Sequence, residues 1–373
     1  MTSEPTTATG AGTRSARDGW FGWLDGSLLT LCVGSLAVVV VGGLVQVSFG
    51  TFSMTVVEAW QAVVDPQVLF DRRAWESFLL GSELPEMDRR SLVVWNIRLP
   101  RVFVAVLVGA NLAVSGAIFQ AVTRNELASP FVLGVSSGAG LTILLTLVVF
   151  TGLTSVLPLL AALGGTVAFL LVYGIAWNGG TSPVRLVLAG VIVNMVFQSL
   201  QRGLFFFADD LGVVQSALAW ITGSLTGTGW DQVRLALLPT VVVVCLTVAG
   251  ARQLNVLLLG SQTARSLGMR VERVRFLLSA VAIVAASTAV AVAGIIAFFG
   301  LVVPHLVRLL VGSDYRRLVV GCLFAGPALM VAADVGARLA LNPAQIPVGV
   351  VTGIIGGPYF LYLMRKRDTL GDI

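Results

Sequence analysis

The sequence predicts an all-α protein that crosses the membrane many times. Of its 373 residues, 56% are hydrophobic and only 12% are charged, and the mean hydropathy is +0.92. Soluble domains carry about 25% charged residues, so this chain is too apolar to be one. Its apolar residues occur in long runs, and a run of about 17 to 25 such residues crosses the hydrocarbon layer as a helix. Open strands are excluded there, because lipid satisfies no backbone hydrogen bonds.

Ten apolar runs have the length of a membrane span. They are 28–47, 102–121, 131–150, 155–177, 184–206, 232–250, 276–293, 295–311, 317–340 and 348–364. The stretch 276–311 is too long to cross once, and we divide it at Gly294. The first run lacks an A-x-A exit and is predicted to be a retained span rather than a signal peptide.

The spans form one transmembrane domain, 28–367, between two tails. The N-terminal tail, 1–27, is rich in Ser, Thr, Gly and Ala and is predicted to be disordered, and 368–373 is a short C-terminal tail. A segment of about fifty residues, 48–97, separates the first two spans, and 251–275 forms a shorter polar loop between the sixth and seventh.

Arginine predicts the orientation of these spans. On one side the loops carry Arg124, Arg185, Arg252, Arg265, Arg270, Arg273, Arg275, Arg316, Arg317 and the "RKR" of 365–367. By the positive-inside rule that side is cytoplasmic, so both termini are cytoplasmic and 48–97 is external. The net charge of +5 is explained in this way, and we predict no nucleic-acid partner.

The loop 251–275 has a pattern suited to contact with another protein. Leu257, Ser261, Ala264 and Gly268 recur at helical spacing and give one face of small and apolar residues. A cleft on a partner could grip such a face closely. The alternative is a connector that lies on the membrane surface and buries 257–259 there, and composition alone does not decide between them.

The histidine and cysteine residues of the sequence do not support a metal site or a disulfide framework. His305 is the only histidine, and Cys32, Cys245 and Cys322 all fall inside apolar runs. We therefore predict no metal site and no disulfide framework. A catalytic constellation is also absent, because the histidine has no identifiable nucleophile or acid partner.

The chain also lacks an energy source of its own. Its only lysine, Lys366, lies in "MRKRD" and not in a phosphate-binding loop, so any ATPase must be another chain. A proton-driven carrier would need carboxylates within the membrane. Asp334 is the only acid inside the predicted spans, and Arg338 lies four residues on, which predicts a helical salt bridge.

Two patterns mark surfaces that avoid lipid. The fifth span carries a polar stripe at helical spacing, namely Asn194, Gln198, Gln201 and Arg202. It could line a pore or form hydrogen bonds between helices. The tenth span carries two overlapping G-x-x-x-G steps formed by Gly349, Gly353 and Gly357. They permit close approach of a helix, either within this subunit or from a second one.

Five blocks of sequence resemble, in the same order, the FecCD-type permeases of ABC importers for iron–siderophore complexes, haem and cobalamin. The blocks are "VVWNIRLPRVFVAVLVGANLAVSGAIFQ" (93–120), "LASPFVLGVSSGAG" (127–140), "LVLAGVIVN" (186–194), "FFGLVVPHLVRLLVGSDYRRL" (298–318) and "IPVGVVTGIIGGPYFLYLM" (346–364). The resemblance extends from residue 28 to the C-terminus. The chain departs from the pattern at Glu126, where a proline is usual, and at Tyr315, where a histidine is frequent.

The resemblance implies a fold and a set of partners. The fold is the inverted-repeat type II ABC importer permease, with ten spans per chain and two chains per transporter. The partners are a second permease chain, identical or a sister, two ABC ATPase subunits that hold ATP and Mg, and an extracytoplasmic binding protein. This chain would bind no cofactor itself.

The resemblance also implies roles for particular residues. ATPase coupling would fall to Leu257, Gly260, Ser261, Ala264, Arg265, Leu267 and Gly268. Docking of the binding protein would fall to Arg98, Arg101 and Arg338, which taken alone also fit arginines at a membrane interface. The polar stripe and the three glycines would line the path between subunits, and Thr181 and Ser182, in a predicted turn, would form the cytoplasmic gate.

The predicted function is therefore that of the membrane-spanning permease of an importer for ferric siderophores. It would act in the cell membrane of a bacterium by alternating access at the dimer interface. Import of cobalamin or haem is the alternative within the family. An ion-coupled secondary transporter is the alternative from another class, and it would need no ATPase.

Overall fold

The computed structural model describes residues 25–49, 54–208, 210–341 and 345–368 and is all-helical over them. Each of the ten predicted spans coincides with a helix. These helices are α1 (Gly26–Ser48), α6 (Leu99–Thr123), α7 (Val135–Val148), α8 (Leu157–Ala176), α9 (Pro183–Phe205), α11 (Trp230–Leu258), α13 (Val271–Ala293), α14 (Phe299–Val311), α15 (Tyr315–Leu339) and α16 (Val348–Asp368). The prediction of an all-α polytopic protein is confirmed. The predicted tails lie almost wholly outside the described residues.

Length separates these helices into two groups. Seven are long and apolar enough to cross a membrane, whereas α7, α14 and the apolar part of α16 are shorter. A further short apolar helix, α10 (Leu211–Thr222), lies between the fifth and sixth predicted spans.

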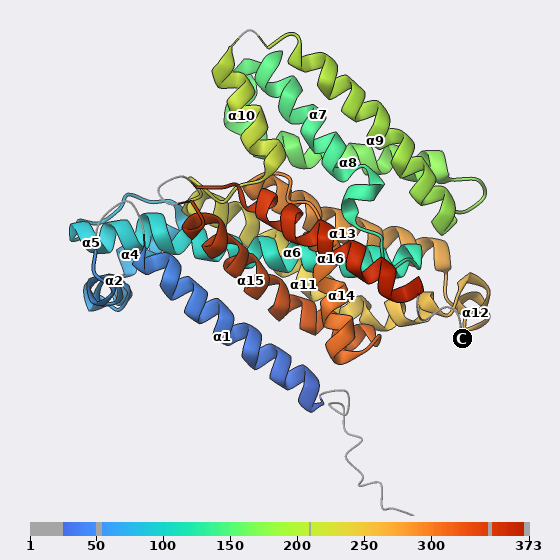
Figure 1. Cartoon of the computed structure of the whole chain (residues 1–373), viewed down its shortest axis with the longest axis horizontal. Helices are drawn as coiled ribbons and strands as arrows, with labels where there is room; N and C mark the ends of the chain where they lie inside the picture. The colour runs from blue at the N-terminus through green and yellow to red at the C-terminus, as the bar shows by residue number, and fades with distance from the viewer. Residues whose placement is uncertain (1–24, 50–53, 209, 342–344, 369–373) are drawn as a thin grey trace, which may run out of the picture.

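The core is built around α6, which packs against α11, α13, α14 and α15 (Figure 1). Glycines let the backbones meet there. A Cβ atom at Gly116 would lie 1.7 Å from the carbonyl oxygen of Gly300 in α14, and one at Gly109 would lie 2.5 Å from that of Gly326 in α15. Small residues at these crossings allow the close van der Waals packing that holds helices together in lipid.

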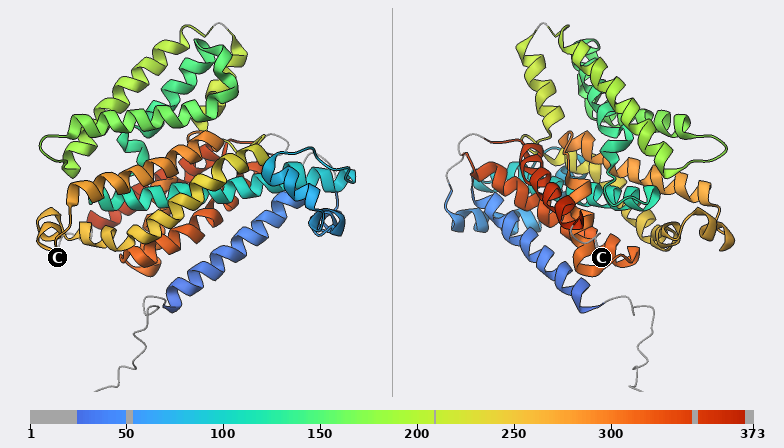
Figure 2. Two further views of the ribbon diagram at one scale, coloured as in Figure 1. Left: turned by 180° about the vertical axis from the view of Figure 1, so that it is seen from behind. Right: turned by 45° about the vertical axis from the view of Figure 1, so that its right-hand side comes forward.

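A second layer, formed by α7, α8 and α9, lies along one side of this core (Figure 2). Its helices also cross at small residues, since a Cβ at Gly138 would lie 2.3 Å from the carbonyl oxygen of Gly164. Contacts of α13 with α8 and α7 join the layer to the core.

The chain breaks at Gly294, as predicted. α13 ends at Ala293, and Gly294 adopts φ +71°, a conformation that favours glycine. The N–H of Ile295 then donates to the carbonyl of Trp220 at 2.9 Å, at the end of α10. Because a Cβ at Gly294 would lie 2.3 Å from that carbonyl oxygen, only glycine fits.

The segment 48–97 forms a helical cap at one end of the bundle, opposite the end that carries α12 (Ser261–Ser266) (Figure 1). Its elements are α2 (Val56–Val63), α3 (Pro66–Leu69), α4 (Arg72–Leu80), α5 (Arg89–Val93) and the π-helical turn Val94–Arg98. The ring of Phe78 stacks between Trp95, at 5.5 Å, and Trp230 of α11, at 4.8 Å. The indole N–H of Trp230 donates to the carbonyl of Trp95 at 2.7 Å. These contacts anchor the cap on α11.

Candidate functional site

A buried ion pair joins α6 and α15 near the cap. Both Nε and Nη2 of Arg101 donate to the carboxylate of Asp334 at 2.8 Å. The amide of Gln46 in α1 donates to the same carboxylate at 2.6 Å. The predicted salt bridge between Asp334 and Arg338 is therefore wrong: the flat fork of Arg101 matches the carboxylate better. Arg338 instead donates to the backbone carbonyl of Gln46 at 2.9 Å.

The three arginines predicted to dock a binding protein all make contacts inside this chain. Arg98 is 4% exposed, and its guanidinium donates to the carbonyls of Val47 and Ser48 at the end of α1. Arg101 is 8% exposed, whereas Arg338 is half-buried. Two of the three therefore present little guanidinium surface, and they hold α1, α6 and α15 together. Their docking role stays a prediction.

The polar stripe of α9 divides into two pairs. Asn194 donates to the carbonyl of Phe131 at 2.9 Å, and Gln201 donates to that of Ser137 at 2.8 Å. These two residues thus fix α9 against the start of α7. Gln198 and Arg202 are exposed and line a cavity of about 340 Å³. Gln201 also lines this cavity. Asn194 and Gln201 thus form hydrogen bonds between segments, as one interpretation expected, whereas a role of the stripe in the transport path stays a prediction.

The three glycines of α16 also differ from one another. The N–H of Gly349 donates to the carbonyl of Gly223, and a Cβ at Gly349 would lie 2.0 Å from the carbonyl oxygen of Thr222. Gly349 thus serves packing within this chain. At Gly353 and Gly357 a Cβ would meet nothing within 4 Å among the described residues, so this face of α16 is open.

The loop 251–275 is not one continuous helix, which corrects our prediction. Leu257 belongs to α11, Gly260 turns the chain at φ +98°, and α12 covers only Ser261–Ser266. Ala264 and Leu257 are buried at 0% and 3% exposure, so they face this chain and not a partner. Of the predicted coupling residues, Arg265, Leu267 and Gly268 are exposed. The side chain of Arg265 is 63% exposed, and Leu267 is exposed to the same extent.

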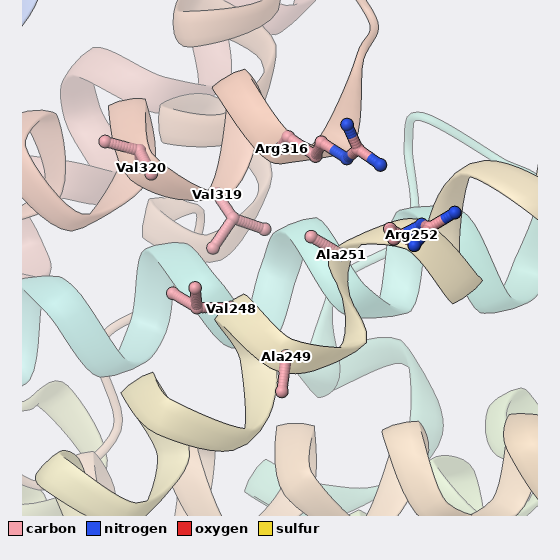
Figure 3. A pocket seen from close by; sticks show the side chains of 7 residues that line it. All are labelled: Val248, Ala249, Ala251, Arg252, Arg316, Val319 and Val320. Atoms are coloured by element: carbon pink, nitrogen blue, oxygen red, sulfur yellow. The ribbon is translucent and has the colours of Figure 1, made fainter. Parts of the chain in front are cut away.

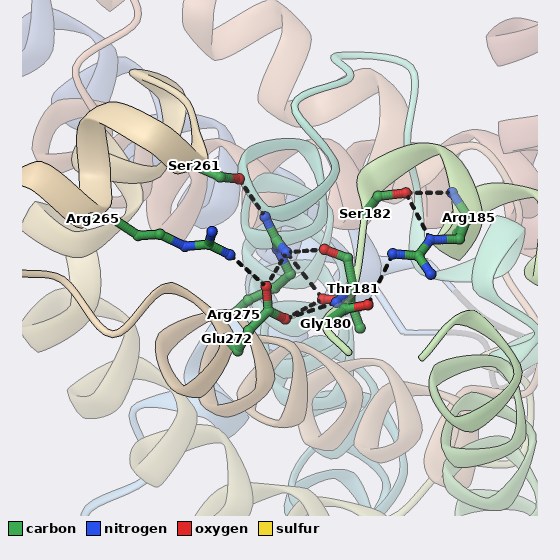
Figure 4. Close-up of polar contacts among 8 residues, drawn as sticks. All are labelled: Gly180, Thr181, Ser182, Arg185, Ser261, Arg265, Glu272 and Arg275. Carbon is green, nitrogen blue, oxygen red and sulfur yellow. Dashed lines mark hydrogen bonds and ion pairs between the residues drawn. The ribbon is translucent and has the colours of Figure 1, made fainter. Parts of the chain in front are cut away.

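Arg275, on the first turns of α13, joins α12 to the turn between α8 and α9 (Figure 4). It is 2% exposed. Its Nη1 donates to the carbonyl of Thr181 at 2.5 Å and to the Thr181 hydroxyl at 3.0 Å, and its Nη2 donates to the Ser261 hydroxyl at 3.2 Å. One guanidinium therefore contacts the predicted coupling helix and the predicted gate.

Glu272 completes this group, which we name the Arg275 cluster and which consists of Thr181, Ser261, Arg265, Glu272 and Arg275. The Glu272 carboxylate accepts from the N–H of Thr181 at 2.9 Å and from its hydroxyl at 2.7 Å. It lies 3.2 Å from Arg275 and 3.8 Å from Arg265. Sequence reasoning missed Glu272, although it is the only acid in 251–275.

The predicted turn at Thr181 and Ser182 is confirmed. Ser182 is the N-cap of α9, and its hydroxyl accepts the N–H of Arg185 at 3.2 Å. This cap fixes where α9 begins. The gate role of the turn stays a prediction.

The two positions at which the chain departs from the permease pattern contact one arginine. Arg308 of α14 donates to the hydroxyl of Tyr315 at 3.2 Å and lies 3.8 Å from the carboxylate of Glu126. It also donates to the side-chain oxygen of Gln120 at 2.9 Å. The two departures therefore belong to one polar cluster that joins the end of α6 to α14 and α15.

A groove of about 460 Å³ lies between α11 and α15 (Figure 3). It is lined by Val248, Ala249, Ala251, Arg252, Arg316, Val319 and Val320. The two arginines lie toward one end of the groove and the valines toward the other.

Comparison with known proteins identifies the family to which these helices belong. Residues 38–366 match the sequence model of the FecCD transport family. The chain belongs to this family. It is thus a transport subunit and not an enzyme: a bacterial multi-pass permease of the ABC importers for iron chelates, haem or cobalamin.

Curated members of the FecCD family resemble the chain over most of its length. The iron(3+)-hydroxamate import permease FhuG of Bacillus subtilis is 40% identical over 75% of this chain and 85% of its own. The hemin transport permease HmuU of Yersinia pestis is 40% identical over 74% and 84%. The cobalamin import permease BtuC of Halobacterium salinarum is 41% identical over 75% of each chain.

A solved structure shows the same fold. It is described as an inward-facing conformation of a metal-chelate type ABC transporter. It superposes with a TM-score of 0.76 at 26% identity and covers 91% of this chain and 99% of its own.

Proposed function

We propose that the chain is the permease of an ATP-driven importer of ferric siderophores. The proposal of this cargo rests on the 40% identity to the hydroxamate permease over 85% of that protein, together with the metal-chelate transporter of the same fold. Cobalamin or haem is the second candidate, because permeases named for those cargoes are as similar, at 41% and 40%.

The translocation path would run between two copies of this fold. The open face of α16 at Gly353 and Gly357 supports this, because glycine spaced in this way lets a helix of another subunit approach closely. The second chain is this one again or a sister permease. Gln198 and Arg202 would then face the path, since polar groups in a membrane avoid lipid.

The end that carries α12 would face the cytoplasm and two ATPase subunits, which hold ATP and Mg. The exposed Arg265 and Leu267 support this contact. The arginine-rich loops at this end indicate that it is cytoplasmic, and both termini then lie on the same side. ATP binding and hydrolysis would shift α12, and the Arg275 cluster joins α12 to the gate at Thr181.

The cap formed by 54–98 would receive the substrate-binding protein on the external side. In this arrangement the half-buried Arg338 is available for direct contact, while Arg98 and Arg101 position α1 and α6 beneath the docking surface. A carboxylate on the binding protein suits a guanidinium partner.

Uptake by cells tests the proposal. Cells with and without the gene would be supplied with radio-iron siderophores, haem and labelled cobalamin, with the partner ATPase intact or inactivated. Loss of iron-siderophore uptake alone, reproduced by ATPase inactivation, is the expected result. Loss of cobalamin or haem uptake would keep the importer and change its cargo, whereas uptake that is indifferent to the ATPase would overturn the proposal.

A further inference from the structure

Arg275 is unusual among the arginines at the α12 end because its whole side chain is enclosed. It is 2% exposed and contacts three separate segments: α12 through Ser261, its own helix through Glu272, and the α8–α9 turn through Thr181. A buried guanidinium that loses its hydrogen bonds and counter-charge is costly, so the position of Arg275 depends on all three contacts.

The contacts within the cluster differ in number and strength. Two bonds from Thr181 to Glu272 and two from Arg275 to Thr181 fix the turn to α13. The link to α12 is a single bond to the Ser261 hydroxyl at 3.2 Å, with a longer ion pair from Arg265 to Glu272 at 3.8 Å. Because a contact of about 3.6 Å is no longer a hydrogen bond, a small shift of α12 would break this link first.

One donor of Arg275 is unused. Its Nε is buried and has no hydrogen-bond partner among the described residues. When the Ser261 bond breaks, the guanidinium can rotate and donate from Nε instead, so that it keeps the same number of hydrogen bonds. The cluster therefore offers a second arrangement when the Ser261 contact is lost.

We propose that Arg275 is a positioning residue that transmits movement of α12 to the turn at Thr181 and so to the start of α9. Release of Ser261 lets the guanidinium rotate, and rotation withdraws it from the carbonyl and hydroxyl of Thr181. This inference rests on the proposed function, in which α12 contacts the ATPase and the turn is the gate.

The test uses the complete transporter in liposomes, with its ATPase and binding protein, and measures substrate uptake and ATP hydrolysis separately. For Arg275→Met we expect hydrolysis to continue while substrate transported per ATP falls about tenfold or more, as for loss of hydrogen bonds to a charged group. Arg275→Lys keeps the charge but not the fork and should recover only part of the ratio. Ser261→Ala removes only the hydrogen bond to α12 and should also lower the ratio.

Arg234→Met is the matched control. Arg234 lies at the opposite end of the bundle and also donates to two backbone carbonyls, those of Ser77 and Phe78. Its loss should leave the ratio unchanged. If Arg275→Met fails to insert, Ser261→Ala and Thr181→Val decide the question.

Two failures are distinguishable. A wild-type ratio in the Arg275 and Ser261 variants would overturn the role of Arg275 alone. A wild-type transporter whose uptake ignores ATP would overturn the proposed function instead.

A second inference concerns the groove between α11 and α15, and it rests on a different observation. The guanidinium groups of Arg252 and Arg316, which line it, have no ion pair or hydrogen bond with any residue that the structure describes. The remainder of the lining is alanine and valine, with the valines away from the arginines (Figure 3). The groove is thus cationic at one end and apolar at the other.

The groove also lies where helices leave the hydrocarbon layer. α11 has 29 residues, and a helix of that length measures about 43 Å against a hydrocarbon layer of about 30 Å. Arg252, close to its C-terminal end, therefore lies near the headgroups, and α15 begins beside it with Asp314 as its N-cap.

We infer that this groove binds an anionic phospholipid, with the phosphate between Arg252 and Arg316 and an acyl chain along Val248, Val319 and Val320. Guanidinium groups bind phosphate through paired hydrogen bonds. Anionic lipids are enriched in the cytoplasmic leaflet, where basic pockets between helices bind their headgroups.

Native mass spectrometry of the purified permease, exchanged into phosphatidylglycerol or phosphatidylcholine, tests this site. The wild type should retain phosphatidylglycerol in preference, and the double variant Arg252→Gln/Arg316→Gln should lose that preference. Arg72→Gln/Arg73→Gln, on the external cap, removes the same charge and should keep it. A double variant that still prefers phosphatidylglycerol as strongly as the wild type would overturn the inference. If that variant also loses ATPase co-purification, the arginines would instead belong to the ATPase contact.

Discussion

Removal of the carboxylate charge at Asp334 should destabilise the permease strongly. Asp334 is 1% exposed and accepts two bonds from Arg101 and one from Gln46. Asp334→Asn keeps the shape of the side chain but leaves the Arg101 charge buried without a counter-charge. Breaking a buried pair in this way costs about 3–5 kcal/mol. At about 2.1 cal/mol/K per residue, 373 residues have an unfolding entropy of about 0.8 kcal/mol/K, so the melting temperature should fall by about 5 °C.

The assay is thermal unfolding of the detergent-purified permease, arranged as a double-mutant cycle. Arg101→Leu and Asp334→Leu should each destabilise the protein, and the double variant should lose less than the sum because no charge is left unpaired. The exposed pair Arg72–Glu76, with side chains 91% and 41% exposed, is the matched control. Its removal should cost less than about 0.5 kcal/mol.

The result also separates two roles for Arg101. Additive losses, or an Asp334→Asn variant as stable as Glu76→Gln, would refute the structural reasoning. Arg101→Leu that leaves stability unchanged but weakens binding-protein affinity would give Arg101 the docking role instead.

Three further predictions concern packing, coupling and pH. Gly116→Val should abolish membrane insertion, measured by detergent-stable yield, because its Cβ would lie 1.7 Å from the Gly300 carbonyl oxygen. Gly353→Ala should keep the monomer yield and weaken dimer formation, because its Cβ would meet no described residue within 4 Å. Leu267→Asp should lower ATPase co-purification by about tenfold, whereas unchanged co-purification would remove α12 from that contact. Bonds from Thr55 hold the pKa of Glu58 below its usual 4.5, with Arg90 adding to this. A lowered folded pKa stabilises α2 above that value. The protection factors of the amides in 56–63, which compare each exchange rate with the intrinsic rate at the same pH, should therefore fall as pH falls below 4.5, and Glu58→Gln should remove this acid dependence.

The sequence predicted the spans well because their signal is physical and local. Length and apolarity alone determine which runs can cross a bilayer, and Gly294 broke the overlong run because its backbone adopts φ +71°. The same reasoning failed where a local rule competed with a distant residue. The four-residue spacing along one helix predicted a salt bridge between Asp334 and Arg338. The partner of Asp334 is instead Arg101, which is 233 positions away in the sequence.

The candidate site shows the same limit. Helical spacing joined Leu257 to Gly268 as one face, but the glycine at 260 turns the chain and puts Ala264 inside. The signal was present in "LGS", a glycine followed by a residue that favours helix starts. The Arg275 cluster could not be predicted, because it unites residues from 181 to 275 that only the packing of α8, α9 and α13 brings together.

The two ends of the bundle differ in how strongly their polar groups are bonded, and this difference predicts which end moves first. Near the cap, Arg101 and Asp334 share two parallel bonds, and Arg101 also donates to Gln345 at 2.9 Å. At the other end, the only side-chain hydrogen bond from Arg275 to α12 is the single one to Ser261. A paired fork resists rotation, since both bonds must break together, while one hydroxyl contact can be lost alone. A displacement that begins at α12 would therefore open the Arg275 cluster first, with the cap end as the fixed point.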